Sequence, residues 1–401
     1  MGQIYSILYI MSTPLLPSDA DRPASLLECL KQLPDPRIDR TQDHRLIDIL
    51  VIGICTLLCG GEGFNDMEDF GESKEDWLKT FLELPNGIPS HDTFNRVFAA
   101  LDPDRFLECF LQWTQGLRNA TDKEIVAMDG KALRRALNKG QPLPYIVSAW
   151  AVENGLVLGQ VKVADKSNEI TAVPELLRAL ELAGCIVTLD AMGCQKKIAK
   201  EIIESDADYV LALKGNQETV HEEVKSYLDD AIAQLAIKPT AIPPLPSPLA
   251  FHQTVEKDHG RIETRRYWQS QTLDWFADLA KWEGLRSVGV VESVRDINGQ
   301  VTTERRYYLS SLPRDILCFA RAVRSHWGVE NNVHWHMDVS FGEDQSRART
   351  GFAAENLATL RRLALNMLKR EKTKKRGIRG KQKNAGWNHA YLLRLLGVSL
   401  D

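Results

Sequence analysis

The order of strand-like and helical segments between residues 125 and 216 constrains the fold most. Three strand-like runs are followed by a helix, a strand, a helix and a strand, at 125–129, 145–152, 156–164, 171–180, 185–190, 195–204 and 209–216. Asn154 and Gly155 separate the second and third runs, which is typical of a β-hairpin turn. Thr171 is expected to cap the first helix, with Pro174 in its first turn. The alternation predicts a mixed α/β domain.

This order is that of an RNase H-like sheet, in which three strands form a meander and the later strands are joined through helices. It places Asp129 at the end of the first strand and Asp190 at the end of the fourth. Those two strands are neighbours in that fold, and α/β sheets carry their chemistry at strand ends. We therefore expect the two carboxylates to meet, and a third to come from a later helix.

Glu330 is the expected third carboxylate. It continues an apolar stripe of residues that recur at helical spacing, Ile316, Phe319, Ala320, Val323 and Trp327. A carboxylate on the buried side of a helix is costly unless a cation neutralises it. Two aspartates and a glutamate can hold the two ions of a Mg²⁺ or Mn²⁺ site. The alternatives for the third carboxylate are Asp338, Glu343 and Asp344, and Asp129 alone could be a turn residue.

Three further side chains lie at four-residue steps from Glu330 and are candidate auxiliary residues. His326, His334 and Asp338 could be metal ligands, a general acid or DNA contacts. A zinc hydrolase site is the alternative, but the HExxH motif is absent and the HWH sequence alone is a weak signal. The GxxxxGK[ST] and GxGxxG motifs are absent too, so no nucleotide cofactor is expected.

Basic residues gather near the predicted site and at the C-terminus, which favours a nucleic-acid partner. The formal net charge is -4, yet the segment from Arg361 to the end carries +10 and residues 1–360 carry -14. The candidate DNA-contacting residues are Lys131, Arg134, Arg135, Lys196, Lys197, Arg261, Arg265, Arg266, Lys374, Lys375 and Arg376. Taken singly, such cations are more often a solvated helix face or a charged edge strand.

The flanking segments predict further parts of the molecule. Residues 12–118 are expected to form a helical domain with possible DNA binding, and Ser90 should cap one of its helices. The core would occupy 120–235 and 313–370, interrupted at 236–312 by a Pro-rich linker and a β-rich insertion. Residues 371–401 form a basic tail with a short final helix. The basic run is too charged to pack, so it should be solvated or on phosphate.

Cysteine usage and hydropathy bear on the compartment. Seven cysteines without a CxxC pair argue for a reducing interior and against a disulfide scaffold. The longest apolar run, from Leu46, contains Asp48 and is too short to span a bilayer, so a buried core helix is expected. These features favour a cytoplasmic protein without a membrane partner.

Several sequence blocks resemble a known family. AMDGKALR, KSNEITAVPELL, VTLDAMGCQ, YVLALKGNQ, HGRIETR and HWGVENNVHWHMDVSFGEDQSRAR are similar to signature blocks of the H-repeat-associated insertion-sequence transposases, a DDE class with an RNase H-like core. The LPDPR to SHDTFNRVF region resembles their N-terminal associated domain. The resemblance covers nearly the whole chain and implies a metal-dependent DNA transposase whose acidic triad falls on Asp129, Asp190 and Glu330.

The resemblance also sets expectations for activity and partners. It implies cleavage and strand transfer of double-stranded DNA at element ends and target, with a homodimer in the complex. The alternatives are an inactive DNA-binding relic and a nuclease without strand transfer. In the wider superfamily a tyrosine, an arginine and a lysine flank the glutamate, where this chain has Val323, His326 and Met337. The departure puts the role of His326 in doubt.

Overall fold

The computed structural model describes residues 26–38, 40, 42–119, 121, 123–136, 144–163, 169–237, 249–258 and 261–397. The longer helices are α1 (Leu26–Lys31), α2 (Leu46–Cys59), α3 (Phe64–Leu78), α4 (His91–Ala100), α5 (Pro103–Leu117), α6 (Glu169–Ala179), α7 (Lys196–Glu204), α8 (Glu218–Ile237), α9 (Ile316–His326), α10 (Trp335–Val339), α11 (Ala353–Arg370), α12 (Ile378–Trp387) and α13 (His389–Leu396). The strands are β1 (Ile125–Ala132), β2 (Tyr145–Ala151), β3 (Leu156–Val163), β4 (Ile186–Leu189), β5 (Asp208–Leu213), β6 (Leu249–Asp258), β7 (Arg261–Ser270), β8 (Ser287–Ile297) and β9 (Gln300–Ser310). The bulk of the predicted Pro-rich linker lies outside the described residues.

One sheet organises the described part of the chain, with the strand order β3-β2-β1-β4-β5-β9-β8-β7-β6. The first three strands are antiparallel, whereas β1, β4 and β5 are parallel neighbours. This is the expected RNase H-like order, so the fold class is confirmed. The register pairs Met128 with Leu189, which brings the next residues, Asp129 and Asp190, to the same edge of the sheet.

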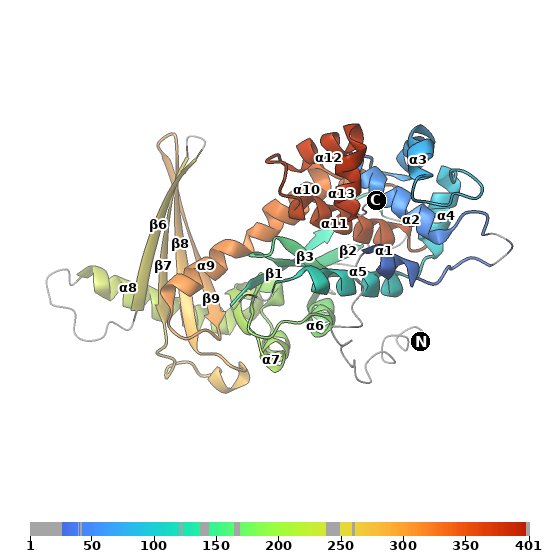
Figure 1. Cartoon of the computed structure of the whole chain (residues 1–401). Coiled ribbons are helices and arrows are strands. Elements are labelled where there is room, and N and C mark those ends of the chain that lie inside the picture. The colour runs from blue at the N-terminus through green and yellow to red at the C-terminus, as the bar shows by residue number, and fades with distance from the viewer. Residues whose placement is uncertain are drawn as a thin grey trace.

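The β-rich insertion continues the same sheet. Strand β9 pairs antiparallel with β5, and β8, β7 and β6 follow as long antiparallel strands. In Figure 1 these four strands rise away from the helices that gather at the opposite end of the molecule. The insertion therefore extends the core by main-chain hydrogen bonds.

Helices cover both faces of the sheet. Val126, Met128 and Leu189 point to the face covered by α6 and α7, where one hydrophobic cluster lies. Ile125 and Ile186 point to the other face, where they pack with Phe319 of α9 in a separate cluster. Because strand side chains alternate, Asp129 and Asp190 belong to the α9 face.

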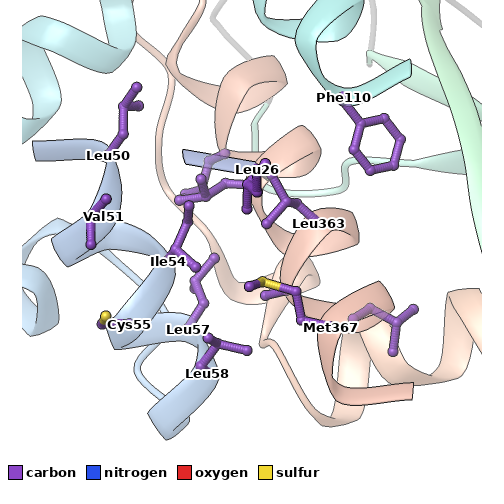
Figure 2. Close-up of a cluster of buried hydrophobic side chains, with 14 of the residues drawn as sticks. Leu26, Leu50, Val51, Ile54, Cys55, Leu57, Leu58, Phe110, Leu363 and Met367 are labelled. Carbon is purple, nitrogen blue, oxygen red and sulfur yellow. The ribbon is translucent and has the colours of Figure 1, made fainter. Parts of the chain in front are cut away.

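The N-terminal helices and α11 share one core. Figure 2 shows Ile54 and Leu57 of α2 close to Leu363 and Met367 of α11, although about 300 residues separate them. Helix α2 spans the expected residues 46–59 and ends at Gly60, whose φ of 95° is left-handed. No single described helix could cross a membrane; α2 and α3 together could by length and composition, but they meet at a 96° bend.

Two local expectations need correction. Helix α6 begins at Glu169, so Thr171 lies within its first turns instead of capping it. The C-terminal basic run is not wholly solvated, because residues 378–387 form α12 and bury Lys381 and Gln382. The expected cap at Ser90 is confirmed: its hydroxyl accepts a hydrogen bond from the Thr93 amide at 3.4 Å.

Candidate active site

Asp129 and Asp190 lie side by side at the carboxyl ends of two parallel strands. Both line a small pocket together with Gly130 and Gly193. The Oδ1 atom of Asp190 accepts the amides of Met192 and Gly193 at 2.9 and 3.3 Å, in the turn that follows β4. The Oδ2 atom of Asp190 makes no hydrogen bond within the described residues, so one oxygen is fixed and the other remains available.

The larger described pocket lies elsewhere, between α3, α4 and the loop at 345–350. Neither aspartate lines it. The paired carboxylates are therefore the chemically distinctive feature, although their own pocket is small.

The helix that carries Glu330 crosses the face bearing both aspartates, but its phase differs from the expected one. Helix α9 ends at His326, and a π-helical turn, η7, spans Glu330–His334. A turn at Trp327 interrupts the helix before this segment, and the apolar stripe of α9 does not continue to Glu330. Val329, Val333 and Met337 are buried instead, and Glu330 is exposed. The expected burial of this carboxylate is wrong.

Two histidines on either side of Glu330 contact the strand ends. His326 Nδ1 lies 3.0 Å from the Thr188 hydroxyl, two residues before Asp190. His334 Nδ1 lies 3.5 Å from Asp129 Oδ2. Glu330 stands midway between them in sequence. This segment is thus anchored beside both aspartates through the histidine side chains.

Both histidines are neutral near pH 7. Burial lowers the pKa of His326 to about 4, although the nearby Asp190 opposes this shift. Burial also lowers the pKa of His334 to about 4, and the positive charges of Arg362 and Lys131 act in the same direction. A neutral imidazole can accept a hydrogen bond or bind a metal. His334 Nε2 is buried without a hydrogen-bond partner among the described residues.

Lys131 is not available to DNA, which corrects the expectation for this residue. Its side chain is only 9% exposed, and its ammonium lies 2.7 Å from Asp338, 2.8 Å from Asp344 and 3.5 Å from Glu343. Three of the acids near Glu330 are therefore occupied by one lysine. This pairing argues against Asp338, Glu343 and Asp344 as the third carboxylate.

Arg362 completes this buried network. Its guanidinium lies 2.9 Å from Glu343 and donates a hydrogen bond at 3.1 Å to Ser148, the β2 residue paired with Asp129. Burial would raise the pKa of Glu343, but Arg362 and Lys131 lower it to about 2. Arg362 was not among the residues predicted from the sequence. The sequence feature that could have identified it is a charged residue inside the apolar run of α11.

The remaining predicted DNA contacts divide into exposed and paired cations. Those exposed to solvent are Arg134, Arg135, Lys197, Lys374, Lys375 and Arg376, of which Arg134 also lies 3.5 Å from Asp344. Lys196 pairs with Asp278 at 2.7 Å. Arg265 pairs with Glu256 of β6 at 2.9 Å and Arg266 with Glu292 of β8 at 2.8 Å, and Arg261 lies 3.6 Å from Glu263 of its own strand. The arginines of β7 thus pair with acids of the long strands, although β7 lies between β6 and β8 and is not the edge strand that the alternative interpretation assumed.

The donor set suits a hard divalent cation, but a complete metal site is not assembled. No group of three or more His, Cys, Asp or Glu side chains is arranged to hold a metal in the part of the chain that the structure describes. Asp129 and Asp190 offer carboxylate oxygens at adjacent strand ends, with one Asp190 oxygen unengaged. Glu330 is close in sequence to both contacting histidines and has an exposed side chain. These residues fit Mg²⁺ or Mn²⁺ in ligand type.

Comparison with known proteins gives consistent matches. Residues 120–367 match the family described as "Transposase DDE domain", and residues 27–114 match "DDE_Tnp_1-associated". "H repeat-associated putative transposase YhhI" of Escherichia coli K12 is 38% identical over 93% of this chain and 98% of its own length. "Putative transposase YncI" of Escherichia coli O157:H7 is 39% identical over 93% of this chain and 94% of its own length.

Two further matches are shorter or more distant. "Inactive transposase YbfQ" of Escherichia coli K12 is 46% identical over 72 residues, 18% of this chain and 86% of its own length. A solved piggyBac transposase synaptic complex with hairpin DNA has a TM-score of 0.44 and 12% identity, and covers 95% of this chain and 83% of that chain. At that level of similarity it supports no functional argument.

Proposed function

Because the chain belongs to the transposase DDE domain family, we propose that it cleaves DNA at the ends of its own element and joins the freed 3' hydroxyl to target DNA. The observation that carries this proposal is the pair of carboxylates, Asp129 and Asp190, at the ends of adjacent strands that the histidines on either side of Glu330 contact. The catalytic and metal-binding residues would be these three.

The chain's own side chains have distinct tasks in this proposal. Two bound Mg²⁺ or Mn²⁺ ions would activate an attacking oxygen and stabilise the leaving oxygen of an in-line phosphoryl displacement. Asp190 presents one oxygen while backbone amides hold the other. His334, 3.5 Å from Asp129, would orient that carboxylate, and the exposed Glu330 would supply the third.

DNA is the proposed partner, and the exposed cations near the strand ends would contact its phosphates. Arg134 and Arg135 follow β1, and Lys197 lies in the first turn of α7, after Asp190. Such contacts position a duplex without reading its sequence. A homodimer is expected in the complex because two element ends must be brought together. We place the protein in the cytoplasm, on nucleoid DNA.

An assay of strand cleavage and joining tests the proposal. The substrate is a duplex that carries the DNA flanking the chain's own coding sequence, supplied with Mg²⁺ or Mn²⁺. Asp190→Asn should abolish cleavage and leave DNA binding intact. Asp230→Asn, on the exposed side of α8, is the matched control and should cut like the wild type.

Each other outcome has a defined meaning. Cleavage by Asp190→Asn at the wild-type rate would show that the site is misassigned. Cleavage without joined products would identify a nuclease. Binding without cleavage, together with calorimetry showing no divalent binding that depends on Asp129, would identify an inactive DNA-binding relic.

The third carboxylate is tested by comparing two acids. Glu330→Gln should reduce cleavage as strongly as Asp190→Asn. Asp338→Asn should leave most of the cleavage intact, because Asp338 pairs with Lys131. The reverse order would transfer the role to Asp338.

A further inference from the structure

Helix α12 is anchored through polar groups on its inner side. Lys381 is buried, and its ammonium donates hydrogen bonds to the carbonyls of Leu368, at 2.7 Å, and of Glu371, near the end of α11. Gln382 donates at 3.2 Å to the carbonyls of both Leu57 and Ser340. The helix is thereby fixed to α11, to α2 and to the end of α10. These contacts fix which face of α12 points to solvent.

The basic turn before α12 is also organised by hydrogen bonds. The Glu371 carboxylate accepts the amides of Thr373 and Lys374, at 2.6 and 3.2 Å, and the Tyr391 hydroxyl at 2.9 Å. Burial would raise the pKa of Glu371, but the hydrogen bonds from Thr373 and Tyr391 lower it to about 2. Arg394 donates to the Thr373 hydroxyl at 3.1 Å. The lysines of this turn therefore project from an ordered backbone.

The outer face of α12 carries two cations and one tryptophan at steps of four residues. Arg379, Lys383 and Trp387 form this stripe, and all three are exposed. Trp387 is 80% exposed, the highest value of any large hydrophobic side chain in the described part of the chain. Tryptophan is enriched at binding interfaces because its large apolar ring also carries a polar N–H group.

Few acids accompany these cations. Lys372, Lys374, Lys375 and Arg376 are exposed beside the stripe. Arg379 approaches Glu62 at 3.8 Å, and the others have no ion pair within the described residues. We call these four residues together with Arg379, Lys383 and Trp387 the α12 platform.

We propose that the α12 platform binds the backbone of duplex DNA, with Trp387 packing against a sugar or an exposed base. This inference rests on the proposed function and assigns part of the DNA path to the C-terminal helices, away from the strand ends. Six exposed cations, of which only Arg379 has an ion pair within the described residues, match a row of phosphates, whereas lysine is depleted at interfaces between proteins. Cations interleaved with an aromatic side chain also suit nucleic acid.

The salt dependence of DNA affinity measures the number of phosphates that the protein neutralises. Removing one cation that neutralises a phosphate should reduce the slope of log affinity against log salt by about 0.9. Arg379→Gln with Lys383→Gln should therefore reduce the slope by about 2. Trp387→Ala should weaken binding by roughly tenfold with little change in slope, since it removes packing without removing charge.

The measurement is fluorescence anisotropy of the full chain with a labelled duplex that carries the flanking DNA. The matched control is Lys200→Gln with Lys225→Gln, two surface lysines on α7 and α8 that lie near acids. Thermal melts should show all variants folded, because the altered side chains lie at the surface. An equal loss of affinity and slope in the control pair would show that binding depends only on the net charge of the protein, which would overturn the inference.

Other outcomes also decide the matter. Unchanged slope and affinity in the platform variants would overturn the inference. Better competition by single-stranded RNA than by duplex DNA would assign the platform to another ligand. The readout is binding, so failure of the Asp190→Asn cleavage test would refute the proposed chemistry without touching this result, and the reverse also holds.

Discussion

Lys131→Met is the perturbation for which the structure gives the clearest consequence. The ammonium lies within 2.8 Å of two carboxylates and 3.5 Å of a third, and methionine would remove the charge while keeping most of the volume. Glu343 would retain Arg362 and Asp344 would retain Arg134 at 3.5 Å, but Asp338 would lose its close cation and Asp344 its closer one. Leaving a buried charge without its partner costs about 3–5 kcal/mol. Asp338 and Asp344 are partly exposed, which lowers the expected cost to about 3 kcal/mol.

The assay is chemical unfolding at pH 7, followed by the same measurement at lower pH. Lys162→Met is the matched control, since Lys162 of β3 is partly exposed and, among the described residues, pairs with a single acid, Glu355, at 3.1 Å. This substitution should cost about 1 kcal/mol or less. The cost of Lys131→Met should shrink as the pH falls from 7 to 4, because the unpaired carboxylates then take up protons and become neutral.

A second readout concerns divalent ions. The uncompensated acids of Lys131→Met should attract a cation, so calorimetry should show additional Mn²⁺ binding relative to the wild type. The reasoning about this network would be refuted if Lys131→Met unfolded at the same denaturant concentration as the wild type at every pH and bound no additional Mn²⁺.

Three further predictions concern packing and protonation. Asn366→Ala should destabilise the protein by about 2–3 kcal/mol in denaturant unfolding, since the Asn366 amide bonds both backbone groups of one β3 residue at 2.8 Å; unchanged stability would contradict this. Gly289→Ala should cost about 1–3 kcal/mol, because a Cβ there would lie 2.4 Å from the Phe319 ring, and a thermal melt unchanged from wild type would exclude the clash. His326 and His334 have a pKa of about 4 when folded and about 6.5 when unfolded, so the unfolded state binds more protons as the pH falls below 6.5. The free energy of unfolding should fall from pH 7 to 5 by about 1–2 kcal/mol for each histidine. Replacing both histidines with glutamine should flatten this pH dependence in denaturant unfolding.

The sequence by itself determined the local elements and the pairing of the two aspartates. Runs of apolar residues predicted strands β1 to β5 in their order. In an RNase H-like sheet with that order β1 and β4 are adjacent, which places Asp129 next to Asp190. The hairpin at Gly155, whose φ is 64°, and the capping role of Ser90 also followed from local chemistry. These features depend on residues close in sequence or on the topology of one sheet, so the pattern of apolar and polar residues is enough to predict them.

Only the tertiary structure decided which partner each charged side chain has. The helix breaks after His326, and beyond that break Glu330 is exposed, whereas His334, at the end of the π-turn, lies beside Asp129. Lys131 became the centre of an acidic cluster more than 200 residues away in sequence, and Lys381 was buried against carbonyl oxygens. Periodicity reports which residues share a face of one element. It contains no information about the charge that a distant element brings to that face, and that charge determines whether a lysine faces DNA or a buried carboxylate.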